Sequence, residues 1–151
     1  MKKITITLIA LCSFMPYAFG MKPGIESGKI RFILSKVINK TDKDIVFSTP
    51  QYKYLTVKPY ETLSTHQEIP HEHLNIGSTG RLDELSMMCS PREGATCALI
   101  QAGRTLLNQE HYEESTVGKN ADVLIDVILE GNNLEQSTIK FIGANRYYKA
   151  Y

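Results

Sequence analysis

The chain has little charge imbalance, no low-complexity tract and no internal repeat. Its 151 residues include 17 basic and 16 acidic side chains, for a net charge of +1 with histidine neutral. So small an imbalance gives no electrostatic reason to expect nucleic acid or an anionic membrane as the partner. Beyond its start, no apolar run reaches the about 20 residues that a membrane-spanning helix needs. We therefore expect that the chain, once the N-terminal segment described below has been removed, does not insert stably into a membrane.

The sequence also lacks the short motifs of common enzyme classes. Gly77-Ser-Thr-Gly80 does not have the Gly-x-Ser-x-Gly spacing of a nucleophile elbow. Neighbours such as Asp83 and Glu84 face opposite sides of an extended strand, so they are no natural acid and base couple. There is no phosphate-cradling loop and no interleaving of basic and aromatic residues for stacking on bases. We predict no catalytic or cofactor-binding residues. Of the three functional hypotheses considered in this section, a small hydrolase without a recognisable motif ranks last.

The first 20 residues have the three-part pattern of a secretory signal peptide. Two lysines precede the apolar run 4–15, and the small-residue pattern Ala18-x-Gly20 follows it. The run is too short to span a bilayer. We predict a removed signal peptide over 1–20, a single mature domain over 21–151, and export to the bacterial periplasm or beyond. Removal of the two lysines leaves 15 basic against 16 acidic residues, a net charge of −1.

Cleavage would leave two of the three cysteines, Cys89 and Cys97. An even pair in an oxidising compartment favours a disulfide. Pro91 and Gly94 lie between them and are typical turn residues, so the pattern predicts a hairpin with a disulfide at the base of its loop. Their spacing does not match the Cys-x-x-Cys pattern of redox or zinc sites. Arg92 would then lie at the exposed tip of the loop.

Alternation of apolar and polar residues predicts strands along the mature chain. The clearest strand spans Val123 to Leu129, and a Gly-Asn-Asn turn signal leads to a returning strand at 138–142. Ile30 to Leu34 and Ile45 to Phe47 flank a polar turn and predict a hairpin, while the polar stretch 108–121 is interpreted as a loop. About eight short strands with close turn signals predict an all-β fold, a small antiparallel β-sandwich with one hairpin disulfide.

The segment 29–65 resembles immunoglobulin-like sandwiches of secreted bacterial proteins. Three features carry the resemblance: the turn that begins Asn39-Lys-Thr-Asp, the strand Ile45 to Phe47, and the Lys-Pro-Tyr-Glu segment at 58–61. These are elements of turn chemistry and not a family signature. The resemblance implies an immunoglobulin-like architecture for the sandwich.

Three of the four histidines lie close together, at His66, His71 and His73. In an extended segment, side chains two apart point to the same side, so His71 and His73 could converge on one ion. Neutral imidazoles bind copper(II) and zinc well. A periplasmic protein that binds copper or zinc is therefore the alternative function. The opposing interpretation is a solvated loop beside Pro70 that binds metal only adventitiously.

The leading hypothesis from the sequence is an exported, non-enzymatic β-sandwich that acts by binding. The partner that we expect for it is another protein. It rests on the missing catalytic motifs and on a loop pinned by a disulfide, because rigid scaffolds commonly present binding residues on such loops.

Overall fold

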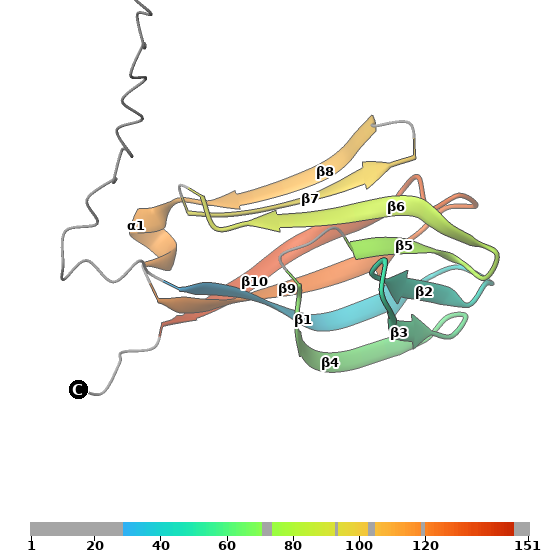
Figure 1. The fold of residues 1–151 in the computed structure, drawn as a ribbon, viewed down its shortest axis with the longest axis horizontal. Coiled ribbons are helices and arrows are strands. Elements are labelled where there is room, and N and C mark those ends of the chain that lie inside the picture. Colours follow the sequence, from blue (N-terminus) through green and yellow to red (C-terminus); the bar gives the residue numbers. More distant parts are fainter. Residues whose placement is uncertain (1–28, 71–73, 93, 103–104, 119, 147–151) are drawn as a thin grey trace, which may run out of the picture.

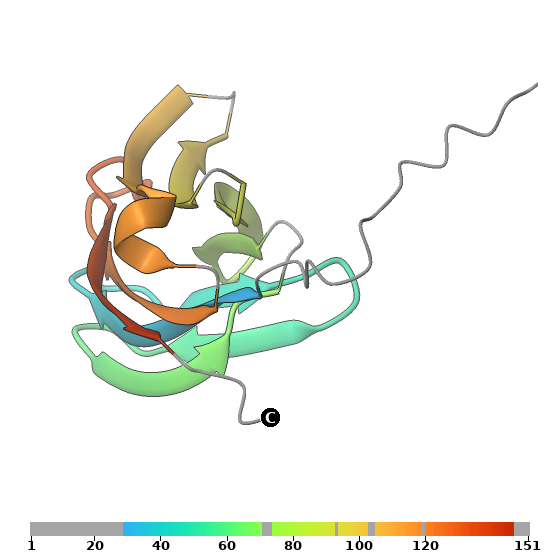
Figure 2. The same cartoon turned by 90° about the vertical axis from the view of Figure 1, so that its left-hand side faces the viewer.

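The computed structural model describes residues 29–70, 74–92, 94–102, 105–118 and 120–146. These ranges form an all-β domain of two sheets that lie face to face, with one short helix at one end (Figures 1 and 2). The predicted all-β class is confirmed. In the described ranges no helix is long and apolar enough to cross a membrane. The predicted signal peptide over 1–20 lies outside the described residues.

The four-stranded sheet has the strand order β10-β9-β1-β4, and the six-stranded sheet has the order β3-β2-β5-β6-β7-β8. In chain order the elements are β1 (Ile30–Asn39), β2 (Ile45–Ser48), β3 (Lys53–Val57), β4 (Thr62–Glu68), β5 (Leu74–Ser78), β6 (Arg81–Ser90), β7 (Ala95–Gln101), β8 (Thr105–Tyr112), α1 (Glu114–Val117), β9 (Ala121–Leu129) and β10 (Thr138–Arg146). Each terminal strand of a sheet is an edge strand. The sandwich therefore has two sides along which the edges of the two sheets lie near each other.

Two expectations about strand pairing are wrong. The predicted hairpin of β1 and β2 does not form, because β1 pairs with β4 and β9 whereas β2 pairs with β3 and β5. The turn between them crosses from one sheet to the other. The sandwich is also not antiparallel throughout, since β1 runs parallel to β9 with Ile30 opposite Ala121 and Asn39 opposite Leu129. Alternation assigns a strand's side chains to its two faces, but it does not choose the neighbouring strand.

The polar stretch before β9 is only partly a loop, contrary to the prediction. Its first part extends β8 to Tyr112, and the one-turn helix α1 follows. Oδ1 of Asn108 accepts a 2.8 Å hydrogen bond from the backbone N–H of Ile139 in β10. The rings of Tyr112 and Phe141 pack with their centroids 4.6 Å apart. As an edge strand that contacts the other sheet partly through polar side chains, β8 needs few apolar residues.

A tyrosine connects the two sheets on the side of the sandwich formed by the edge strands β3 and β4. The hydroxyl of Tyr54 in β3 donates a 2.6 Å hydrogen bond to the carbonyl of Glu68 at the end of β4. Burial, with smaller contributions from the nearby Tyr52 and Glu68, raises the pKa of Tyr54 to about 12. The hydroxyl therefore remains protonated, and able to donate this bond, across the physiological pH range.

The core lies between the sheets and follows the predicted alternation in β9. Val123, Ile125, Val127 and Leu129 are all completely buried. Full burial of one such side chain contributes about 1.5–3 kcal/mol relative to leaving it in water. The largest buried side chains come from both sheets and from Ile69, which directly follows β4. Those in strands are Phe32, Leu34, Ile45, Phe47, Leu74, Ile76, Leu85, Met87, Leu99, Ile125 and Leu129.

The predicted disulfide joins β6 and β7. Cys89 and Cys97 are directly opposite each other in the hairpin, with Cα atoms 4.1 Å apart. The hairpin prediction is confirmed by this register, which continues through Met87 opposite Leu99. The loop that the disulfide closes lies at the end of the sandwich that carries α1, and Arg92 in that loop is exposed.

The connections at the other end of the sandwich form what we call the loop end. It comprises residues 40–44, 58–61, 79–80 and 130–137, together with Ala102 after β7. These segments join at the right-hand side of Figure 1, because the strands that they connect begin or end there. The loop end gathers segments from both sheets.

On the outer face of the four-stranded sheet, Asp126 lies between two lysines. It is opposite Lys36 of β1 and Lys140 of β10. Within the described residues, its buried Oδ1 atom has no hydrogen-bond partner. Burial raises the pKa of Asp126 above its ordinary value of 3.8, although both lysines act to lower it. The carboxylate form is therefore less favourable in the folded protein than in the unfolded chain.

We expect Asp126→Asn to remove a pH-dependent part of the stability. A raised folded-state pKa means that the folded protein binds the proton more tightly than the unfolded chain does, so protonation stabilises the fold. In the wild type this contribution appears as the pH falls through the raised pKa and is complete below 3.8. Urea denaturation at several pH values should therefore show the variant as the more stable protein at neutral pH, with a difference that shrinks in acid. Asp42→Asn, at an exposed loop position, is the control. A difference that does not vary with pH would contradict this account.

Candidate functional site

The histidines of the predicted metal site are only partly described. His66 lies in β4 and is exposed, whereas His71 and His73 lie outside the described residues. In the part of the chain that the structure describes, no group of three or more His, Cys, Asp or Glu side chains could hold a metal ion. The copper or zinc site at His66, His71 and His73 therefore stays a prediction.

Asn39, the last residue of β1, connects two turns of the loop end. Its side chain is buried, and Nδ2 lies within hydrogen-bond distance of three backbone carbonyls, those of Lys43 (2.8 Å), Val57 (3.2 Å) and Lys58 (2.9 Å). Its Oδ1 accepts hydrogen bonds from the backbone N–H of Thr41 at 2.9 Å and from the Thr41 hydroxyl at 2.7 Å. One amide thus ties the β1–β2 turn to the β3–β4 turn.

Tyr60 is an exposed aromatic residue on this braced turn. Its side chain is 73% exposed, and its φ of 56° lies in the left-handed region. A residue other than glycine there costs about 1–2 kcal/mol. The conformation is held by a 3.2 Å hydrogen bond from the Tyr60 N–H to the Thr41 carbonyl, and by a 2.7 Å bond from the Lys58 N–H to Oε2 of Glu61. The turn therefore holds the backbone of Tyr60 rigidly while its ring remains in solvent.

Charged side chains link the loops further. Lys58 and Asp44 form an ion pair of 2.7 Å, and Lys40 and Glu130 form one of 3.2 Å. The hydrogen bond and charge of Asp44 raise the pKa of Lys58. Exposed ion pairs contribute little to stability, because water and salt screen them. Their main consequence here is geometric, because they restrict how the turns lie relative to one another.

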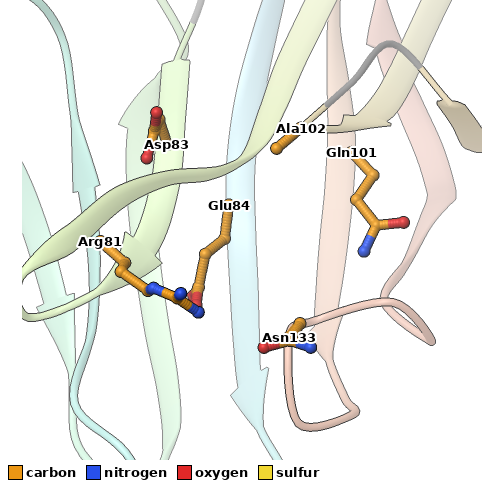
Figure 3. A pocket seen from close by; sticks show the side chains of 6 residues that line it. All are labelled: Arg81, Asp83, Glu84, Gln101, Ala102 and Asn133. Atoms are coloured by element: carbon orange, nitrogen blue, oxygen red, sulfur yellow. The ribbon is translucent and has the colours of Figure 1, made fainter.

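A polar pocket opens beside these turns, between segments of both sheets. Its volume is about 310 Å³, and its lining residues are Arg81, Asp83 and Glu84 of β6, Gln101 and Ala102 at the end of β7, and Asn133 of the β9–β10 loop. Figure 3 shows the ends of the Arg81 and Glu84 side chains beside each other in this view, with Gln101 and Asn133 across from them and Asp83 lying apart. The lining thus combines a guanidinium group, carboxylates and two amides.

Glu84 is the buried member of this pocket, with 9% of its surface exposed. Its Oε2 accepts a 3.0 Å hydrogen bond from the backbone N–H of Ser78, and its Oε1 lies 3.4 Å from the Ser78 hydroxyl. The ion pairs between described residues do not include Arg81. The pocket therefore presents the Glu84 carboxylate, which Ser78 at the end of β5 holds in place, and the Arg81 guanidinium, which forms no ion pair with another described residue and can contact a ligand.

The β9–β10 loop holds Asn133 by its own hydrogen bonds. The backbone N–H of Asn133 donates a 2.8 Å hydrogen bond to Oε2 of Glu135. Backbone N–H groups of Glu135 itself and of Asn133 lower the pKa of the Glu135 carboxyl. Gly131 has a φ of 97°, a backbone conformation that L side chains rarely adopt, so the turn favours glycine there. Leu134 is buried and anchors the loop to the core.

A second hollow of about 460 Å³ lies beside the β2–β3 turn. Val46, Ser48 and Tyr52 contribute to its wall, and Lys53 is its one charged lining residue. It offers fewer groups for specific polar recognition than the pocket of Figure 3. We therefore take the polar pocket and the Tyr60 turn, both at the loop end, as the candidate functional region.

Sequence reasoning did not find this region. The pocket combines residues from three separate segments, and only the Gly-Asn-Asn turn signal marked one of them. In the sequence, Asp83 and Glu84 stand out only as a pair of neighbours, and Tyr60 only as part of a turn. Comparison with protein-family models, with curated protein sequences and with solved structures found no match to this chain.

Proposed function

We propose that this chain is an exported, non-enzymatic binding protein whose loop end contacts another protein. The observation that carries the proposal is Tyr60, an exposed ring held in a costly backbone conformation by a network around a buried asparagine. Strained, well-supported residues of this kind concentrate at functional sites. Tyrosine is also enriched at binding hot spots, because its ring supplies contact area and its hydroxyl a hydrogen bond.

The test of this proposal uses Tyr60→Gly, which removes the ring and relieves the left-handed backbone. We expect the variant to be as stable as the wild type, or more stable by up to about 1 kcal/mol, while it loses at least about tenfold in affinity for its protein partner. The partner is first trapped with a photo-crosslinking amino acid at position 60 of the full chain, in cells that produce it naturally, and its affinity is then measured by calorimetry.

Tyr52 supplies the matched control. It is also an exposed tyrosine, at 53%, but it has no left-handed backbone and lies in the β2–β3 turn, beside the second hollow that Thr79 and Gly80 also line. Crosslinking at position 52 should not yield the same adduct, and Tyr52→Ala should bind as the wild type does. Adducts that are identical at both positions, or unchanged affinity of Tyr60→Gly, would contradict the proposal.

Export is part of the same proposal. The signal-peptide pattern over 1–20 supports it, and the disulfide between Cys89 and Cys97 is compatible with an oxidising compartment. N-terminal sequencing of the protein recovered from the periplasm or the medium should give Met21 as the first residue. Recovery of the uncleaved chain from the cytoplasm alone would refute it.

The immunoglobulin-like assignment of the sandwich is likewise a proposal. Two sheets packed face to face support it. The ten strands of the described ranges exceed the seven to nine strands of immunoglobulin domains, so any such relationship would involve added strands.

A further inference from the structure

We propose that the polar pocket of Figure 3 binds a neutral, polyhydroxylated ligand of about the size of a monosaccharide. This goes beyond the protein-binding role proposed above, because it assigns a small-molecule ligand to a separate set of residues. It does not depend on Tyr60, which does not line the pocket.

The hydrogen-bonding capacity of the pocket matches hydroxyl groups. Arg81 offers only donors and the Glu84 carboxylate only acceptors, whereas the amides of Gln101 and Asn133 offer both. A hydroxyl group donates one hydrogen bond and accepts others. Neighbouring hydroxyls on a sugar ring can therefore satisfy donors and acceptors of the pocket at the same time.

The charges of the pocket favour a neutral ligand over an ion. One cationic and two anionic side chains line it. An anion that approached Arg81 would be opposed by the Glu84 carboxylate, and a cation that approached Glu84 would be opposed by Arg81. A neutral hydroxylated ligand encounters neither repulsion and can still form strong hydrogen bonds to charged groups.

The volume of the pocket limits the size of the ligand. Its volume of about 310 Å³ lies at the lower end of the range for ligand sites. Its described lining contains no aromatic ring on which a sugar could stack. We therefore expect a single sugar unit, either free or at the end of a longer glycan, with a dissociation constant of about 1 mM.

The Glu84 carboxylate is held in place by the protein, and so are the backbone segments that carry Asn133 and Gln101. The Ser78 N–H orients the Glu84 carboxylate, and the Glu135 carboxylate fixes the backbone of Asn133. Gln101 ends β7, where Ala102 N–H donates a 3.0 Å hydrogen bond to the carbonyl of Glu84. Such order lowers the conformational entropy that binding would otherwise cost.

The experiment is a titration of the isotopically labelled protein, monitored by two-dimensional NMR. The neutral probes are glucose, galactose, mannose and N-acetylglucosamine; gluconate is the anionic probe and glycine the zwitterionic one. We expect saturable shifts in the backbone signals of Arg81, Glu84, Gln101 and Asn133 with at least one neutral sugar. Gluconate and glycine should produce none.

Two lining positions that are not buried permit variants that keep the fold. Gln101→Leu and Asn133→Ala each remove an amide from the pocket, and each should weaken sugar binding by about tenfold. Gln109→Leu and Asn145→Ala make the same chemical changes on exposed parts of β8 and β10 and should leave binding unchanged. Thermal denaturation verifies that all four variants remain folded.

Three results would overturn the proposal: no saturable shift with any of the four sugars, stronger binding of gluconate or glycine, or full sugar affinity in Gln101→Leu and Asn133→Ala. None of these results bears on the crosslinking test at Tyr60. The two proposals can therefore fail independently.

Discussion

Asn39→Ala is expected to lower the free energy of unfolding by about 3–4 kcal/mol. The alanine leaves the carbonyls of Lys43, Val57 and Lys58 without their shared amide donor, and it removes the acceptor for the Thr41 N–H and hydroxyl. Because position 39 is 1% exposed, water cannot replace these bonds without opening the two turns. The corresponding fall in melting temperature is about 10 °C.

Asn39→Asp tests the hydrogen bonds donated by Asn39 more specifically than Asn39→Ala does, because it keeps the shape of the side chain. The carboxylate can still accept hydrogen bonds from Thr41, but it places a negative oxygen opposite the three carbonyls where an amide donated before. We expect it to be at least as destabilising as Asn39→Ala in urea denaturation. Asn145→Ala, on the exposed end of β10, should change stability by no more than about 0.5 kcal/mol. A well-tolerated aspartate at position 39 would show that the network contributes little.

Loss of the Cys89–Cys97 disulfide is expected to destabilise the domain by about 2.5 kcal/mol, the value that the chain-entropy model assigns to a loop of this length. The bond restricts the unfolded chain more than it adds contacts to the folded one. Its removal should therefore also raise the denaturant dependence of the unfolding free energy, because the unfolded chain becomes less compact. Cys97 is completely buried and Cys89 is 9% exposed, so Cys89→Ala with Cys97→Ala is the suitable double variant.

Four samples separate the effect of the bond from that of the side chains. These are the oxidised wild type, the wild type with its disulfide reduced, and the double alanine variant with and without reductant. Reductant should lower the urea midpoint of the wild type and leave that of the double variant unchanged. An unchanged wild-type midpoint, once mass spectrometry has shown that both thiols are free, would exclude a stabilising role for the disulfide.

The features that could be predicted from the sequence are local ones. The hairpin of β6 and β7 and the pairing of β9 with β10 each join neighbours in the chain across a short turn. Alternation in β9 correctly identified its buried face. These inferences succeed because the two-residue period of a strand and the preferences of turn residues depend on few neighbouring positions.

The features that could not be predicted depend on residues far apart in the chain. The parallel pairing of β1 with β9 brings together segments about 90 residues distant, as the ion pair between Arg31 and Asp122 illustrates. The Asn39 network joins two turns, and the pocket joins three segments. A hydrophilic turn residue such as Asn39 gives no sign in the sequence that it is buried.

By itself, the sequence determined the all-β class, the disulfide and the inward face of β9, because short-range periodicity and cysteine count are sufficient for these. The tertiary structure alone decided which strands are neighbours, that the β1–β2 turn crosses between sheets, and that Arg81, Glu84, Gln101 and Asn133 line one pocket. The physical reason is that packing two sheets selects among many arrangements with the same alternation. That selection arises from the fit of distant side chains, which no single segment contains.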